Sequence, residues 1–113
     1  MKSSVVYEDF TKIDIRVGTI ISAQINNKLQ KPAMVLEIDF GKEIGIKKSS
    51  AQLTKNYTSE KLIHKQVAAV LNFQPKQIGN LLSEVLVLGF PDVNNDPILI
   101  VPDEKISDGG KLY

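Results

Sequence analysis

The arrangement of apolar and polar residues along this chain predicts a protein built from short β-strands. The clearest alternation lies at 34–40, where every second residue is large and apolar, as in a strand that buries one face. A longer alternation at 14–25 predicts a second strand. Further apolar stretches bounded by turn-forming residues predict strands at 44–48, 66–72, 83–89 and 98–101.

The long strand at 14–25 contains a glycine at position 18. A period of two places Val17 and Ile21 on one face of this strand and Ile20 on the other. A glycine inside a strand often marks a bulge or a tight bend, as a small closed barrel requires. We therefore expect the strand to bend at Gly18.

Short helical segments are expected before and between the strands. Tyr7 and Phe10 are three residues apart, so they would share one face of a helical turn. Ser49 or Ser50 would cap a helical segment that follows the third strand. Helical segments are expected at 7–12 and from the serine cap to about 57, and residues 58–63 form either another short helical turn or an irregular connection.

Several short strands, glycine bends and a helix between the third and fourth strands fit a small Greek-key barrel. The OB-fold is a five-stranded, partly open barrel of this kind, and it binds oligonucleotides on one strand face and its neighbouring loops. We predict a single all-β domain of OB-fold type over residues 1–113, with short helices. An SH3-like or other small barrel is the alternative that the pattern leaves open.

The composition excludes several kinds of chemistry. The chain has no cysteine, and a single histidine, His64, cannot form a histidine-rich metal site. A serine nucleophile needs an adjacent oriented base, and no such partner can be assigned to Ser49 or Ser50. The 92–96 segment lacks the glycine and the distal glutamate of a calcium loop. We expect no enzyme activity, no catalytic residue, no metal and no cofactor.

Two features of the sequence bear on where the protein resides. No apolar run approaches the roughly 20 residues needed to span a bilayer. The N-terminus becomes acidic at Glu8, too early for a signal peptide. A cytoplasmic protein is therefore expected.

Charge is distributed unevenly along a chain whose formal net charge is only +1. Residues 28–83 carry nine lysines against four carboxylates, which gives +5, whereas residues 84–113 carry two lysines against six carboxylates, which gives −4. Such asymmetry can mark a face for a polyanion. The alternative is a solvated lysine-rich surface, which the shortage of arginine favours.

Several segments form an ordered set of motifs. They are FTKIDIRVGTI at 10–20, IDFG at 38–41, KSSAQLT at 48–54, NFQPKQIG at 72–79, SEVLVLG at 83–89 and the tail from Pro102 to Lys111. In this order they resemble the stand-alone tRNA-binding domain family over nearly the whole chain. The resemblance implies an OB-fold homodimer that binds tRNA by shape. One branch of the family is described as secretion-related chaperones, which bind unfolded or exported polypeptides through apolar surface near the dimer interface.

Two loops carry the residue-level resemblance. Asn72 and Lys76 match the family's Asn-x-x-Pro-Lys/Arg loop, and Ser83 matches the serine of its Ser-x-Gly-Met turn. Val85 and Leu86 stand where that turn has glycine and methionine, which is the pattern of the chaperone-like branch. The resemblance implies an export-related chaperone that retains tRNA binding. It would work without ATP, because the sequence has no glycine-rich phosphate-binding loop. A dedicated, structure-specific tRNA-binding protein is the alternative.

The resemblance and the chemistry of the side chains suggest two sets of ligand contacts. Lysines would displace counterions from phosphates, and amide or hydroxyl groups would bond sugar or phosphate oxygens. The expected RNA contacts are Lys31, Lys47, Lys48, Asn72, Lys76 and Ser83. Phe73 and Leu86 are the expected peptide contacts, although Phe73 could stack a base. Alternatively, the lysines serve solubility, and Asn72 and Ser83 satisfy local backbone groups.

Apolar residues at both chain ends suggest self-association. Chain ends are usually poorly ordered unless something holds them, and a symmetric partner would do so. We predict an isologous two-fold dimer, with the N-terminal helical turn within residues 1–13 in its interface. The expected interface residues are Val5, Tyr7, Phe10, Leu112 and Tyr113.

Overall fold

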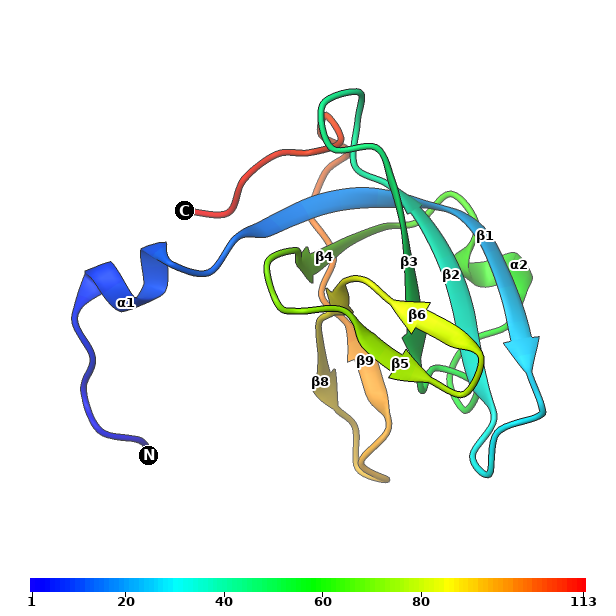
Figure 1. The fold of residues 1–113 in the computed structure, drawn as a ribbon. Coiled ribbons are helices and arrows are strands. Elements are labelled where there is room, and N and C mark those ends of the chain that lie inside the picture. Colours follow the sequence, from blue (N-terminus) through cyan, green and yellow to red (C-terminus); the bar gives the residue numbers. More distant parts are fainter.

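A curled antiparallel sheet of five strands forms the body of the computed structural model, which describes residues 1–113 (Figure 1). The strands lie in the order β3, β2, β1, β4, β7. Their bounds are Ile15–Asn26 for β1, Ala33–Asp39 for β2, Ile46–Ala51 for β3, Gln66–Val70 for β4 and Leu86–Val87 for β7. The prediction of an all-β, OB-type fold is confirmed.

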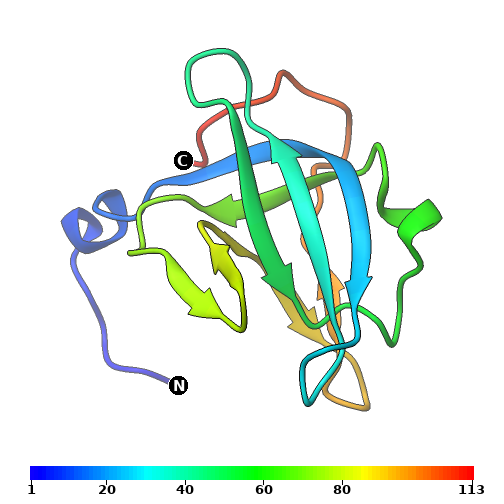
Figure 2. The same ribbon diagram turned by 45° about the vertical axis from the view of Figure 1, so that its right-hand side comes forward.

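Two small ribbons and two short helices complete the fold. The ribbons pair β5 (Lys76–Ile78) with β6 (Leu81–Ser83), and β8 (Gly89–Pro91) with β9 (Pro97–Leu99). The helices are α1 (Tyr7–Thr11) and α2 (Ser59–Leu62), close to the expected positions. Neither helix has the length and apolar character that crossing a membrane requires. In both ribbon views α1 lies out to one side of the sheet, and residues 1–6 extend beyond it; we call residues 1–13 the N-terminal arm (Figures 1 and 2).

The long strand β1 is shared between two partners. Its first half, Ile15–Thr19, pairs with β4, and its second half, Thr19–Asn26, pairs with β2. The register shifts between Ile20 and Ser22, and this bulge changes which side chains face inward. Ile20 and Ala23 are therefore both buried in the core, while Ile21 is exposed. Val17 is buried on the other face of β1, next to Gly110 of the C-terminal tail.

The expected bend at Gly18 is wrong, because this residue keeps regular register opposite Val67. A Cβ at this position would lie 2.7 Å from side-chain atoms of both Ile38 and Phe40. Close packing of β1 over β2 therefore requires the glycine, and the bend lies two to four residues later.

The alternation at 34–40 correctly identifies the inner face of β2. Met34, Leu36, Ile38 and Phe40 are all buried in the core, and Phe40 packs there as expected. Leu53 from the β3–α2 connection, Leu62 from α2 and Val67 from β4 close the core. The core therefore fills the concave side of the curled sheet.

The helix predicted after a serine cap at 49 or 50 is wrong. Both serines belong to β3, opposite Leu36 and Val35 of β2. The hydroxyl of buried Ser49 donates a hydrogen bond to the carbonyl of Val85, 2.9 Å away. A distant partner thus satisfies a side chain that would otherwise suit a helix cap.

The single strand predicted at 83–89 is also wrong, because the chain there is divided among β6, β7 and β8. The β5–β6 hairpin was not predicted. It turns through the Gly79–Asn80 pair, with Gly79 at a φ of +60°. Both departures have one cause: the chain leaves β4, forms a hairpin outside the barrel, and returns to β4 as β7.

The C-terminal tail adds an edge to β1. Arg16 and Lys111 form an isolated antiparallel bridge, and Leu112 N–H donates to the carbonyl of Ile15. The tail occupies the side of the first half of β1 that β2 leaves free. It therefore ends near α1, where Lys111, Leu112 and Tyr113 line a hollow with Tyr7 and Phe10.

Candidate ligand-binding groove

A groove of about 330 Å³ opens beside the β5–β6 hairpin. It is lined by residues of β3, the β4–β5 loop, the hairpin and the start of β7, which is why residues far apart in the sequence meet there. We call it the hairpin groove, and its lining residues are Ser50, Phe73, Gln74, Lys76, Ile78, Ser83, Glu84, Val85 and Leu86. The hairpin lies next to β3 in both ribbon views (Figures 1 and 2).

One wall of the groove is fixed by hydrogen bonds between β3 and residues 83–85, which we call the closing seam. Glu84 N–H donates to the carbonyl of Lys48, and the Glu84 carboxylate accepts from Lys48 N–H at 2.9 Å. The Ser83 hydroxyl oxygen accepts from Ser50 N–H at 3.0 Å. Side chains thus satisfy two outward N–H groups of β3, and the barrel closes without a continuous ladder.

The two residues predicted to bind peptide lie in this groove. Phe73 is 54% exposed and Leu86 is 50% exposed, so each has one apolar face that the protein leaves uncovered. Fully burying an exposed side chain of this kind is worth about 1.5–3 kcal/mol, so covering the exposed half of one is worth about half of that. The pair therefore offers a ligand an apolar contact of useful strength.

Of the residues predicted to bind RNA, Lys76 and Ser83 line the groove. The only two ion pairs in the structure are Lys12–Asp9 and Arg16–Asp14, so the Lys76 ammonium has no carboxylate partner. The Ser83 oxygen is engaged by the closing seam, but its proton is free to donate.

Asn72 has a structural role in its present position. Its side-chain oxygen accepts from Asp14 N–H at 2.8 Å, and its amide group donates to the carbonyl of Lys12 at 2.7 Å. These bonds attach the β4–β5 loop to the segment between α1 and β1. Asn72 therefore orients the loop that carries Phe73, and it is absent from the groove lining.

The remaining predicted lysines lie around the hairpin groove without lining it. Lys48 is exposed and joins the closing seam through its backbone, while half-buried Lys47 faces the other side of β3. Lys31 belongs to the β1–β2 loop. That loop touches the hairpin turn, since a Cβ on Gly79 would lie 2.8 Å from Leu29.

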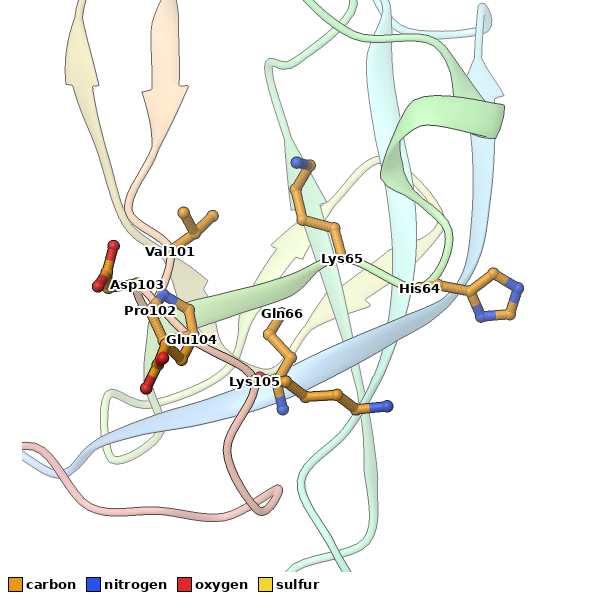
Figure 3. A pocket seen from close by; sticks show the side chains of 8 residues that line it. All are labelled: His64, Lys65, Gln66, Val101, Pro102, Asp103, Glu104 and Lys105. Carbon is orange, nitrogen blue, oxygen red and sulfur yellow. The ribbon is translucent and has the colours of Figure 1, made fainter.

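A second hollow, of about 250 Å³, lies between the α2–β4 connection and the C-terminal loop. It contains His64, but the imidazole points away from the other side chains, as Figure 3 shows. The amide of Gln66 is held by the carbonyl of Ile106 and the carboxylate of Asp108. These side chains do not converge on a common point, and the hollow lacks a nucleophile with an oriented base.

The predicted interface residues partly come together. A hollow at the chain ends is lined by Tyr7, Phe10, Thr11, Ile13, Lys111, Leu112 and Tyr113. The Tyr7 and Phe10 rings lie 6.1 Å apart, but α1 contains no buried residue. Val5 precedes α1 and is also exposed, outside this hollow.

Several groove residues were not predicted, namely Ser50, Gln74, Ile78, Glu84 and Val85. The sequence pattern places Ser50 at the start of a helix and Ile78 in a loop, so it does not predict that both line one groove. The Gly79–Asn80 pair is a known hairpin signal that would have placed Lys76 opposite Ser83.

The sequence matches the model of the putative tRNA-binding domain family over residues 15–111. The chain belongs to this family. It is similar along its length to the crystal structure of chaperone CsaA from Bacillus anthracis, with 44% identity and a TM-score of 0.91, covering 98% of this chain and all of that one. It is also similar to the CsaA chaperone protein from Picrophilus torridus, with 47% identity and a TM-score of 0.90, covering 97% and 100%.

Longer proteins contain the same domain. The methionine–tRNA ligase of Methanococcoides burtonii is 35% identical over 112 residues, which is 99% of this chain. The chain spans only 16% of that ligase, and a similarly small part of the other curated ligases that it matches. The part of each ligase that matches this chain is thus a small fraction of the whole ligase.

Proposed function

We propose that this protein is a CsaA-type, export-related chaperone that binds unfolded or exported polypeptides in the hairpin groove. The observation that carries the proposal is the pair of half-exposed apolar side chains, Phe73 and Leu86, in one groove. Similarity over the full length of two CsaA chaperones supports the same assignment.

The groove has the chemistry that an extended polypeptide segment needs. Phe73, Ile78 and Leu86 supply apolar contact, while Gln74 and Ser83 supply groups that can bond a peptide backbone. Lys76 and Glu84 bring opposite charges to the lining. A groove with little net charge and few fixed polar contacts suits clients of varied sequence.

The proposed mechanism is capture and release by affinity alone. The sequence contains no glycine-rich phosphate-binding motif of the kind that ATP-driven machines use. Exposed apolar segments of a client would bind the groove, and folding or export of the client would remove them from it. The protein is not an enzyme in this proposal, and it works in the cytoplasm as a homodimer.

Binding of tRNA is the second part of the proposal, and a dedicated tRNA-binding protein is the alternative function. Family membership and the unpaired Lys76 favour RNA contact. Lys48 on β3 and Lys31 in the β1–β2 loop lie on elements beside the groove and would add phosphate contacts, and Lys47, on the other face of β3, would contact phosphate outside the groove. Recognition would follow the shape of the RNA, because lysines are point charges that do not distinguish bases.

The test of polypeptide binding is a titration of a fluorescein-labelled, leucine-rich neutral peptide, followed by anisotropy. Leu86→Ala should weaken binding about threefold to tenfold, because the ligand loses its contact with the exposed half of the leucine. Val93→Ala is the matched control, since Val93 is fully exposed in the β8–β9 loop. Equal affinity of the wild type and both variants would remove the groove from the proposal.

A further inference from the structure

Residues expected to contact each of the two kinds of ligand meet in a single groove. Phe73 and Leu86 are the expected peptide contacts, and Lys76 and Ser83 are two of the six expected RNA contacts; all four line the same groove of about 330 Å³. This volume is near the lower end of the range for a site that holds one small ligand. A peptide segment seated between Phe73 and Leu86 would occupy the space that a nucleotide needs beside Lys76.

Hydrogen bonds and packing hold the walls of the hairpin groove in place, so the groove does not widen readily to hold two ligands at once. Ser83 and Glu84 are held to β3 by the closing seam, and buried Ser49 is bonded to the carbonyl of Val85. On the other side, the β5–β6 turn rests against Leu29 of the β1–β2 loop. Widening the groove would break these bonds or the packing at Gly79.

The charges in and around the groove make the two ligands respond differently to salt. RNA binding would rest on lysines without ion-pair partners, and it would act against the Glu84 carboxylate in the lining. If the four predicted lysines contact phosphates, raising salt from 50 to 200 mM should weaken RNA binding roughly 100-fold. Apolar contacts with Phe73 and Leu86 are not weakened in this way.

We infer that the hairpin groove holds one ligand at a time, so that RNA and polypeptide exclude each other and salt concentration decides which one binds. This inference rests on the proposed function. It adds a regulatory consequence, because the concentration of free tRNA in a cell would determine how much of the protein is free to bind client polypeptides.

The experiment is a competition between bulk tRNA and the labelled leucine-rich peptide, on the full chain, at low salt. Strict exclusion predicts that the apparent peptide dissociation constant rises in proportion to free tRNA without a plateau, reaching about tenfold when tRNA is ten times its own dissociation constant. At 200 mM salt the same tRNA concentration should displace little peptide.

Two variants, each with a control, test whether both ligands bind in the hairpin groove. Leu86→Ala should weaken the peptide and leave tRNA affinity within about twofold, while Lys76→Ala should do the reverse. Lys61→Ala in α2 is the control for the loss of a positive charge, and Val93→Ala is the control for the loss of an apolar side chain. Both residues are exposed and lie outside the groove lining. Circular dichroism checks that each variant is folded.

The outcomes separate this inference from the proposed function. If both ligands bind and the apparent peptide constant reaches a plateau as tRNA saturates, a ternary complex forms and exclusion is overturned while the proposed function stands. If the peptide does not bind even without tRNA, the chaperone function itself fails, and exclusion fails with it. If tRNA does not bind at low salt, no exclusion can operate.

Discussion

The hydroxyl oxygen of Ser83 accepts a hydrogen bond from the backbone N–H of Ser50 at 3.0 Å, across the closing seam of the barrel. Together with the Glu84 bonds to Lys48, it substitutes for the ladder that a longer β7 would provide. The serine of the family's Ser-x-Gly-Met turn thus has a structural task in this chain, beside the groove that it lines.

Replacing Ser83 should therefore reduce stability. Ser83→Ala leaves the half-buried Ser50 N–H without its acceptor, so the free energy of unfolding should fall by about 1–3 kcal/mol. Urea denaturation measures the change. Ser83→Thr, which keeps the hydroxyl, should lose less, and Ser107→Ala, at an exposed hydroxyl with no hydrogen bond, should change little. A loss as large in Ser107→Ala would refute the seam assignment.

Lys76 should contribute to RNA binding through charge alone. Lys76→Ala should weaken the binding of all tRNAs to a similar extent and reduce the slope of log K against log salt by about 1. Fluorescence anisotropy with two purified tRNAs at several salt concentrations measures both effects. Lys61→Ala is the matched control. An unchanged slope in the Lys76 variant would mean that this lysine contacts no phosphate.

Gly18 should be intolerant of a side chain because of packing. A Cβ there would meet Ile38 and Phe40 at 2.7 Å, so Gly18→Ala should cost about 1–3 kcal/mol of stability. A double-mutant cycle with Phe40→Leu tests the cause, because a smaller ring-free side chain relieves part of the overlap. The double variant should lose less stability than the two single losses combined. Strict additivity would place the cause elsewhere.

The sequence predicts which residues of a strand are buried when one face of the strand lies in the core. It does not predict side-chain hydrogen bonds to residues that are distant in the sequence. Alternation at 34–40 identifies buried residues because one side of β2 lies wholly in the core. Ser49 was misassigned because its hydrogen-bond partner, Val85, lies 36 residues away. The groove was partly foreseen, since motif resemblance pointed to Phe73 and Lys76, but only the fold places Glu84 beside them.

Asp92 should make the β8–β9 loop sensitive to acid. The Asn56 amide and the N–H groups of Asp96 and Asn94 hydrogen-bond its carboxylate, and these bonds lower its pKa below 3.8 although burial opposes them. The stabilisation is complete above the unfolded pKa and is lost as pH falls through the lower folded pKa. Asp92→Asn should therefore be less stable at neutral pH.

The melting temperatures of the wild type and Asp92→Asn, measured from neutral pH down to acid, test this assignment. The difference between them should shrink once the pH falls below about 4 and toward the folded pKa. Asp103→Asn, at an exposed carboxylate without a hydrogen bond, serves as the control and should track the wild type. A constant difference at every pH would show that the carboxylate charge is not the cause.

The N-terminal arm should depend on a second copy of the chain. A helix of five residues such as α1 does not form stably in water, because nucleation is costly, and α1 buries none of its residues within this chain. Its exposed face includes Tyr7, which is 71% exposed, and it adjoins Leu112 and Tyr113. We therefore expect the protein to sediment at twice its 12.5 kDa chain mass.

Tyr7→Ala should weaken that dimer by about 2 kcal/mol, or roughly 30-fold in dissociation constant, if Tyr7 is a central interface aromatic. Sedimentation velocity over a dilution series measures the constant, and Val93→Ala controls for loss of an exposed apolar side chain. A monomer at every concentration would refute self-association. If Tyr7→Ala leaves the dimer intact, the protein still forms a two-fold dimer, but its interface lies away from the N-terminal arm. Another partner would then have to stabilise α1.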